Sequence, residues 1–208
     1  MALRTIELKP AQAGLSRTLV LLHGYGADEH DLLPIAHELD PRLRAVSLQG
    51  PISMGGGARA WFNLAMGPRG LSFDSGEVRA GVSAAVEAVE AIAKQSARPI
   101  LLGFSQGAGM ALSVALRRPD LVSAVLSFSG VLRALDAADL GPAASLRGLP
   151  VFAAHGTQDS IVPIALGRAL RDEVLRHELV LEWHEYPMGH SVVPEELAAA
   201  RTWLSRLL

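Results

Sequence analysis

The stretch Gly103-Phe104-Ser105-Gln106-Gly107 places a serine between two glycines where an apolar run gives way to a helix-like pattern. This spacing is that of a nucleophile elbow, in which a sharp strand-to-helix turn exposes the serine hydroxyl. Glycine is needed on both flanks because a side chain there would collide with the strained turn. The Gln106 amide at the helix N-terminus can donate to a developing negative charge. Glycines also mark ordinary tight turns, so the residues elsewhere in the chain must decide between the two interpretations.

A nucleophilic serine in such an elbow needs an acid and then a histidine, in that order, further along the chain. Asp159 follows an apolar strand-like run in AAHGTQDSIVP, and His190 follows another in HEYPMGHSVVPEE. Both therefore fall at carboxyl ends of expected parallel strands, where ligands bind in open α/β sheets. We predict that Asp159 orients His190 and that His190 is the general base for Ser105.

Other residues of these types compete for the two roles. His177 falls in a charged helix end, and His184 falls within an expected strand, so both are interpreted as surface or structural histidines. Asp136 and Asp139 lie in a helix-like segment, and Asp172 lies on the solvated face of a helix. Only Asp159 follows a strand, which favours it as the acid.

The second oxyanion donor is expected at an early strand-to-loop junction, and LVLLHGYGADEHDLLP supplies one. The Tyr25 amide would converge with the amide that follows the serine, while His23 is expected to brace the loop. The alternative is a dinucleotide-binding fingerprint, because Gly24 and Gly26 follow a strand. Glu29 stands where that fingerprint requires its third glycine, which argues against it.

The hydrophobic pattern alternates short apolar runs with amphipathic stretches throughout the chain. The runs begin at Thr18, Leu43, Arg98, Leu121 and Leu149, and the clearest helical stretches begin at Gly76, Gln106, Pro163 and Pro194. Such alternation predicts an α/β fold with a mostly parallel sheet covered by helices on both faces. We expect one domain over residues 1–208. The segment 51–76 is expected to be irregular and is a candidate binding loop.

Composition narrows the function classes. The chain has no cysteine, which removes disulfides, thiolate metal sites and cysteine nucleophiles. The formal net charge is -2 and the sequence has no basic run, so nothing predicts a positively charged surface that would bind nucleic acid or an anionic membrane. Charged residues interrupt the first residues, and apolar runs stay shorter than the roughly 18 residues of a membrane span. We therefore expect a cytoplasmic protein without stable membrane insertion, cofactor or metal.

Five motifs, in this order, give a more specific signal than the elbow alone: LLHGYGAD, WFN after a glycine-rich loop, GFSQGA, HGTQDSIVP and YPMGHSVVPEE. Nearly the whole chain resembles the phospholipase/carboxylesterase family of small serine esterases, which includes acyl-protein thioesterases. The resemblance implies an α/β-hydrolase fold without a separate lid domain. It also implies a nucleophile at Ser105, an acid at Asp159, a base at His190, and oxyanion amides at Tyr25 and Gln106.

The sequence departs from the family pattern at two positions. Tyr25 stands where the family usually has leucine, and Asn63 stands where it usually has aspartate. Trp61, Phe62 and Leu64 would supply an apolar wall for an acyl chain. The alternative is that AWFNLAM simply belongs to the hydrophobic core.

Together these observations predict a cofactor-free serine carboxylesterase that acts on short- to medium-chain esters, with thioesters and lysophospholipids as further candidates. A lactone or peptide hydrolase on the same triad is one alternative, and substrate profiling would distinguish it. A non-catalytic scaffold of the same fold is another, because fold alone does not fix function. The expected partner is a small-molecule ester, and the family resemblance is compatible with a homodimer.

Overall fold

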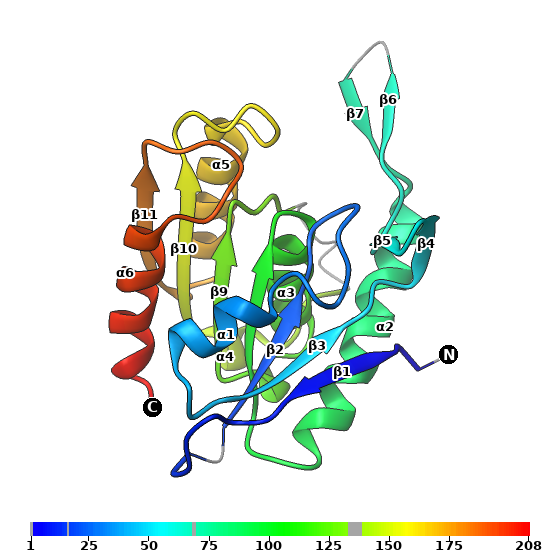
Figure 1. Cartoon of the computed structure of the whole chain (residues 1–208). Helices are drawn as coiled ribbons and strands as arrows, with labels where there is room; N and C mark the ends of the chain where they lie inside the picture. The colour runs from blue at the N-terminus through cyan, green and yellow to red at the C-terminus, as the bar shows by residue number, and fades with distance from the viewer. Residues whose placement is uncertain (1, 16, 68–69, 133–138) are drawn as a thin grey trace.

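A seven-stranded sheet forms the centre of the molecule in the computed structural model, which describes residues 2–15, 17–67, 70–132 and 139–208 (Figure 1). Every neighbouring pair is parallel except β1 and β3. Across the sheet the strands are β1 (Thr5–Leu8), β3 (Arg44–Leu48), β2 (Thr18–Leu22), β8 (Ile100–Phe104), β9 (Ala124–Phe128), β10 (Pro150–Gly156) and β11 (Val180–Tyr186). The predicted mostly parallel sheet is confirmed.

Helices cover both faces of this sheet, as predicted. One face packs against α2 (Ser75–Ala93), α3 (Gln106–Arg117) and α5 (Ile164–Arg176), and the other packs against α1 (Leu33–Leu39) and α6 (Pro194–Ser205) (Figure 1). Short η1 (Pro119–Leu121) and α4 (Ala143–Leu146) complete the helices described.

The strand pleat explains the two separate cores. Along β2, Val20 and Leu22 join the core beneath α2, α3 and α5, whereas Leu19 and Leu21 join the core beneath α1 and α6. Successive side chains of a strand point to opposite faces, so a strand buried on both faces must be apolar throughout. All five residues of β2 are buried.

Residues 51–76 differ from the irregular loop that we expected, because they contain two short hairpins. Strands β4 (Ile52–Gly55) and β5 (Ala58–Ala60) form the first, and β6 (Ala65–Gly67) and β7 (Gly70–Ser72) form the second. Strands of three or four residues beside three glycines carry too little alternation to be recognised in the sequence. The two hairpins form an arm, of which the β6–β7 hairpin extends beyond the carboxyl end of the sheet (Figure 1).

Two further elements were absent from the sequence interpretation. Strand β1 pairs antiparallel with β3 at the edge of the sheet, and α1 lies on the face shared with α6. None of the helices described is both long enough and apolar enough to cross a membrane.

Candidate functional site

Ser105 lies at a strained turn between β8 and α3. Its φ of 56° and ψ of -118° fall outside the regions that L-residues normally occupy. Its N–H donates to Phe128 O at 2.9 Å, which fixes the turn against β9. A Cβ on Gly103 would collide with the Gly107 carbonyl, and one on Gly107 would collide with the Leu22 carbonyl. The two glycines thus let β8, α3 and β2 approach closely enough to hold the serine in this conformation.

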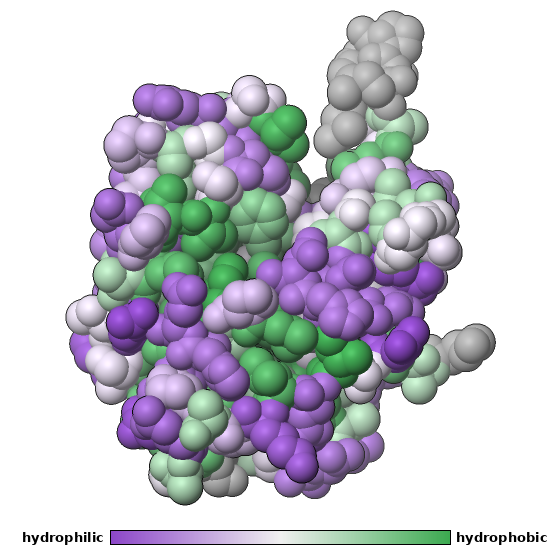
Figure 2. Space-filling model, in the orientation of Figure 1, coloured by the Kyte–Doolittle hydropathy of each residue, from purple (hydrophilic) through white to green (hydrophobic). Residues whose placement is uncertain are grey.

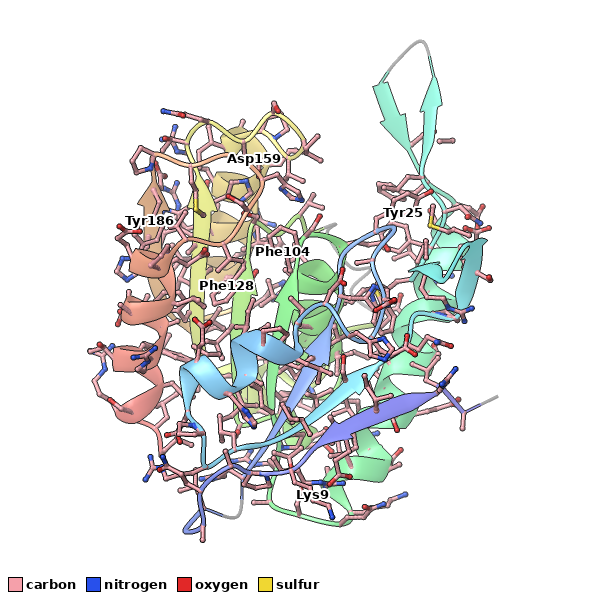
Figure 3. All side chains as sticks on the ribbon, in the orientation of Figure 1. Lys9, Tyr25, Phe104, Phe128, Asp159 and Tyr186 are labelled. Carbon is pink, nitrogen blue, oxygen red and sulfur yellow. The ribbon has the colours of Figure 1, made fainter. Side chains whose placement is uncertain are left out.

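Asp159 and His190 come together from the loops after β10 and β11. The His190 Nδ1 to Asp159 Oδ2 distance is 2.7 Å, although 31 residues separate them in the chain. Gly156 permits this meeting, because a Cβ there would collide with Met188 O. Backbone hydrogen bonds also join the two loops, from Gln158 N to Met188 O at 3.1 Å for example. Tyr25, Phe104 and Asp159 lie toward the same end of the sheet (Figure 3).

The environment of Asp159 favours its ionised form. Its Oδ1 accepts hydrogen bonds from Ile161 N at 2.9 Å and Val162 N at 2.8 Å, while Oδ2 accepts from His190. Burial raises the pKa of Asp159, but hydrogen bonds from His190, Val162 and Ile161 outweigh it and hold this pKa below its ordinary value. Because an ionised carboxylate can only accept, His190 carries its proton on Nδ1 and has Nε2 free to accept.

His190 lies beside the turn that holds the serine. Its ring centroid is 4.8 Å from that of Phe104, the residue that precedes Ser105. Among the described residues, Ser105 Oγ and His190 Nε2 share no hydrogen bond. Catalytic hydrogen bonds are often long in the absence of substrate and tighten when it binds. The three predicted catalytic residues therefore lie in one region, and their roles stay predictions.

The two predicted oxyanion residues approach Ser105 from different elements. Gln106 opens α3, where the first amides have no partner within the helix. A Cβ on Gly24 would lie 3.5 Å from Ser105 Cβ, so the loop that carries Tyr25 packs directly against the serine. Helix N-terminal amides favour a negative charge at such a position.

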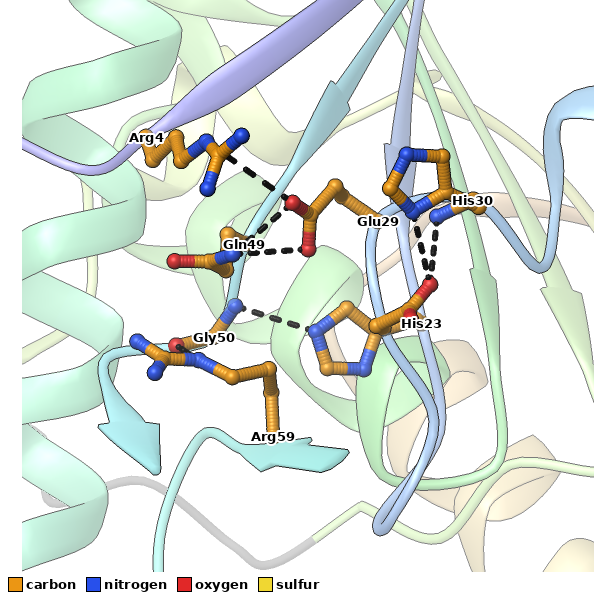
Figure 4. A network of polar contacts seen from close by, with 8 residues as sticks. Arg4, His23, Glu29, His30, Gln49, Gly50 and Arg59 are labelled. Atoms are coloured by element: carbon orange, nitrogen blue, oxygen red, sulfur yellow. Dashed lines mark hydrogen bonds and ion pairs between the residues drawn. The ribbon is translucent and has the colours of Figure 1, made fainter. Parts of the chain in front are cut away.

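A buried histidine braces this loop, as the sequence predicts for His23. Its Nδ1 donates to Gly24 O at 2.8 Å, and its Nε2 accepts from Gly50 N at 3.0 Å (Figure 4). Burial lowers the pKa of His23, so the ring is neutral and keeps this tautomer at neutral pH. In the same network, Gln49 Nε2 donates to both carboxylate oxygens of the buried Glu29.

The predicted acyl wall is fastened to the elbow by the Gln106 side chain. Gln106 Oε1 accepts from Trp61 N at 2.9 Å, and Gln106 Nε2 donates to Phe62 O at 2.8 Å. Trp61 is fully buried and donates from its indole to His23 O at 2.9 Å, so it supports the wall from behind. Phe62 and Leu64 are half-buried and are the members of this group that have exposed surface.

The described surface is hollowed toward the carboxyl end of the sheet, and hydrophobic side chains are exposed on one side of this hollow (Figure 2). Ile161 is 69% exposed and follows the acid by two residues, a position that sequence reasoning did not single out. In the sequence, Ile161 could have been noticed only as an apolar residue in the loop that carries the predicted acid, Asp159.

Asn63, which departs from the family pattern, contacts an acidic neighbour. Its N–H donates to Glu77 Oε2 at 2.8 Å, and its side-chain amide donates to Glu77 Oε1 at 3.1 Å. An aspartate at position 63 would place two carboxylates against each other, which the amide avoids. Asparagine at position 63 is therefore electrostatically compatible with Glu77.

The competing residues lie elsewhere. His177 ends α5 and bonds to Glu173, and His184 lies within β11 and bonds to Glu182. Asp172 is on α5, where it pairs with Arg171, and Asp136 lies outside the described residues.

One group of described residues has metal-ligand types close together. Potential ligand atoms of Asp28, Glu29 and His30 lie within 4.8 Å of one another. Both Glu29 oxygens already accept from Gln49, and Asp28 Oδ1 accepts from His30 N. Those ligand atoms are thus committed to hydrogen bonds that hold the loop.

Comparisons with known proteins bear on the family and the fold of this chain. The family model described as Phospholipase/Carboxylesterase matches residues 5–208. Acyl-protein thioesterase 1 of Yarrowia lipolytica is 25% identical over 216 residues, covering 94% of this chain and 93% of the relative.

Solved structures give the same result at the level of the fold. The Bacillus cereus carboxylesterase is 24% identical, covers 99% of this chain and 95% of its own, and superposes with a TM-score of 0.83. YahD, solved with malic acid, is 26% identical, covers 99% and 100% of the two chains, and has a TM-score of 0.83.

Proposed function

We propose, from the premise that this chain belongs to the phospholipase/carboxylesterase family and is a carboxylic ester hydrolase, that it hydrolyses short- to medium-chain carboxylic esters through an acyl-enzyme on Ser105. The observation that carries the proposal is the 2.7 Å hydrogen bond between His190 Nδ1 and Asp159 Oδ2, formed beside the strained serine turn.

The first half of the reaction forms the acyl-enzyme. His190 Nε2 takes the Ser105 Oγ proton as Oγ bonds to the acyl carbon, and the carbonyl electron pair moves to oxygen. The Tyr25 and Gln106 amides donate to this oxyanion, and each such donor typically contributes about 3 kcal/mol. When the carbonyl re-forms, the alcohol leaves and takes the proton from His190.

The second half regenerates the enzyme. His190 removes a proton from water as the water oxygen attacks the acyl carbon, and Ser105 Oγ leaves with that proton. The role of Asp159 is to hold the imidazole tautomer and to stabilise the imidazolium formed in each half. Its two backbone hydrogen bonds support this role, because they restrict the carboxylate to an orientation that presents Oδ2 to His190.

The substrate range rests on the surroundings of Ser105. The half-buried Phe62 and Leu64 and the exposed Ile161 offer apolar contacts for an acyl chain. Thioesters form a second candidate class, favoured by the similarity to acyl-protein thioesterase 1 over 94% of the chain. A thiolate is a better leaving group than an alkoxide, so the same groups suffice for either class.

The test is hydrolysis of p-nitrophenyl esters of graded acyl length, together with labelling by a fluorophosphonate probe. Ser105→Ala is expected to lose both turnover and labelling, because it removes the nucleophile. Ser191→Ala, which removes an exposed hydroxyl next to His190, is the matched control and is expected to keep both. Turnover that survives in Ser105→Ala would refute the proposed mechanism.

A further inference from the structure

A second histidine, His155, lies behind the acid of the proposed triad. It occupies the penultimate position of β10 and is 1% exposed. Its ring stacks on Trp183 with centroids 6.4 Å apart and planes 27° apart. On the α5 side the ring is so close that a Cβ on Gly167 would collide with it. Packing on both sides therefore fixes the position of this imidazole.

The hydrogen bond of His155 determines its tautomer. His155 Nε2 lies 2.8 Å from Val162 O, and a carbonyl oxygen can only accept, so Nε2 carries the proton. Val162 also donates its own N–H to Asp159 Oδ1 at 2.8 Å. His155 thus holds Val162, the last residue of the 159–162 turn. The amides of this turn fix the Asp159 carboxylate.

The same imidazole faces the second oxygen of this carboxylate. His155 Nε2 is 3.6 Å from Asp159 Oδ2, which is too long for a hydrogen bond, and both side chains are excluded from solvent. Oδ2 therefore faces two histidines and, among the described residues, forms its hydrogen bond with His190, at 2.7 Å. Because the His155 proton is committed to Val162 O, His155 does not compete with His190 for the carboxylate.

We propose that His155 is a positioning residue for the triad acid: by bonding Val162 O, it fixes the 159–162 turn so that Asp159 directs Oδ2 to His190. This inference rests on the proposed function. His155 does not contact substrate in this scheme and acts only through Asp159. The conservative replacement is glutamine, whose side-chain amide can donate to Val162 O from nearly the position of Nε2, whereas leucine removes the donor.

The first test compares kinetics and pH profiles of the ester hydrolysis. His155→Leu is expected to lower kcat by about 10- to 100-fold with little change in KM, the scale of a catalytic group misplaced by about 1 Å. The pH profile of its kcat/KM is expected to differ from the native one, because Asp159 no longer holds His190 in the native orientation. His155→Gln is expected to recover most of kcat.

His184→Leu is the matched control, because His184 lies on the adjacent strand β11 and the partners described for it, Phe152, Tyr186 and Glu182, lie outside the 159–162 turn. It is expected to keep the kcat and pH profile of the native protein. A His155→Leu variant that keeps native kcat, or a His155→Gln variant as impaired as His155→Leu, would overturn the inference.

A double-mutant cycle separates this positioning role from a general loss of packing. In an Asp159→Asn background, adding His155→Leu is expected to cost nothing further, because the carboxylate through which His155 acts is gone. Losses that multiply would mean that His155 acts independently of Asp159 and would overturn the inference.

A measurement that does not depend on ester hydrolysis can test the role of His155 even if the proposed function is wrong. Amide exchange at Ile161 and Val162 measures whether the turn is held. It is expected to accelerate at least about tenfold in His155→Leu, relative to native and His184→Leu proteins, and to stay near native in His155→Gln. If His155→Leu does not fold, native-like exchange together with native-like kcat in His155→Gln still supports the inference, and rapid exchange in that variant overturns it.

Discussion

Glu196 lies in the first turn of α6, and its carboxyl group has no contact with solvent. It is 0% exposed, and neither of its oxygens has a hydrogen-bond partner among the described residues. Burial raises the pKa of Glu196 from its ordinary 4.5 to about 8. At neutral pH the folded protein therefore holds this side chain protonated.

Stability is expected to depend on pH through this residue. Between pH 4.5 and about 8 the unfolded chain releases the Glu196 proton and the folded chain retains it, so stability falls as pH rises across this window. Below pH 4.5 Glu196 is protonated in both the folded and the unfolded chain, so it causes no pH-dependent loss of stability there. Glu196→Gln, which stays neutral, is expected to raise the unfolding free energy at pH 8 by on the order of 2 kcal/mol and to leave it unchanged near pH 4.

Denaturant unfolding at both pH values measures this difference. Glu195→Gln is the control, because Glu195 directly precedes Glu196 in the chain but is exposed, so its replacement is expected to give no comparable gain. Equal effects of Glu196→Gln at the two pH values would contradict the buried, protonated carboxyl.

The sequence predicts different residues of the site with different success. Ser105, Asp159 and His190 could be singled out because each stands in a motif next to a strand end. The positions of His155 and Glu196 could not, because their importance depends on contacts between distant elements. His155 precedes a glycine in a recognised motif, but only the fold places it behind the acid.

At the scale of elements, burial explains which strands could be predicted. The interior strand β9 is buried at all five positions and reads as an apolar run that only Ser127 interrupts. Strand β1 lies at an edge with alternating exposed and half-buried residues, so its four residues give little signal. Helix α1 has only seven residues and no side-chain cap. The strands of the arm hairpins are shorter still, with three or four residues each, so they carry even less pattern.

The contact between the arm and α3 yields a prediction at this scale. Replacing Gln106 by leucine keeps the backbone amide but leaves Trp61 N and Phe62 O without their buried partner. A buried polar group without a partner costs about 1 to 3 kcal/mol, so Gln106→Leu is expected to lose about 2 to 4 kcal/mol of stability. It is also expected to raise KM more for longer acyl chains than for acetate, because Phe62 is no longer held.

Thermal or denaturant unfolding and an acyl-length series measure the two effects. Gln158→Ala, which removes an exposed side chain from the loop of the acid, is the matched control and is expected to leave stability within about 0.5 kcal/mol. A Gln106→Leu variant with native stability and native chain-length preference would show that the arm is held without this contact.

Charge across the whole molecule is nearly balanced and locally paired. The chain carries 19 basic and 21 acidic residues. Many arginines bond directly to a carboxylate, as in Arg44 with Glu7, Arg168 with Glu185 and Arg118 with Asp120. Paired opposite charges cancel within a short distance, so no strong field of one sign is expected to steer a distant ligand.

A neutral ester should therefore reach Ser105 at a rate that salt hardly changes. We expect kcat/KM for p-nitrophenyl butyrate to vary by less than about twofold between about 0.02 and 0.5 M NaCl, because shortening the Debye length from about 20 to about 4 Å has little net field to remove. An ester with a carboxylate on its acyl chain is the comparison, and its kcat/KM should be equally insensitive. A steep fall for the anionic ester alone would reveal a cationic group near the acyl site that the paired arginines do not account for.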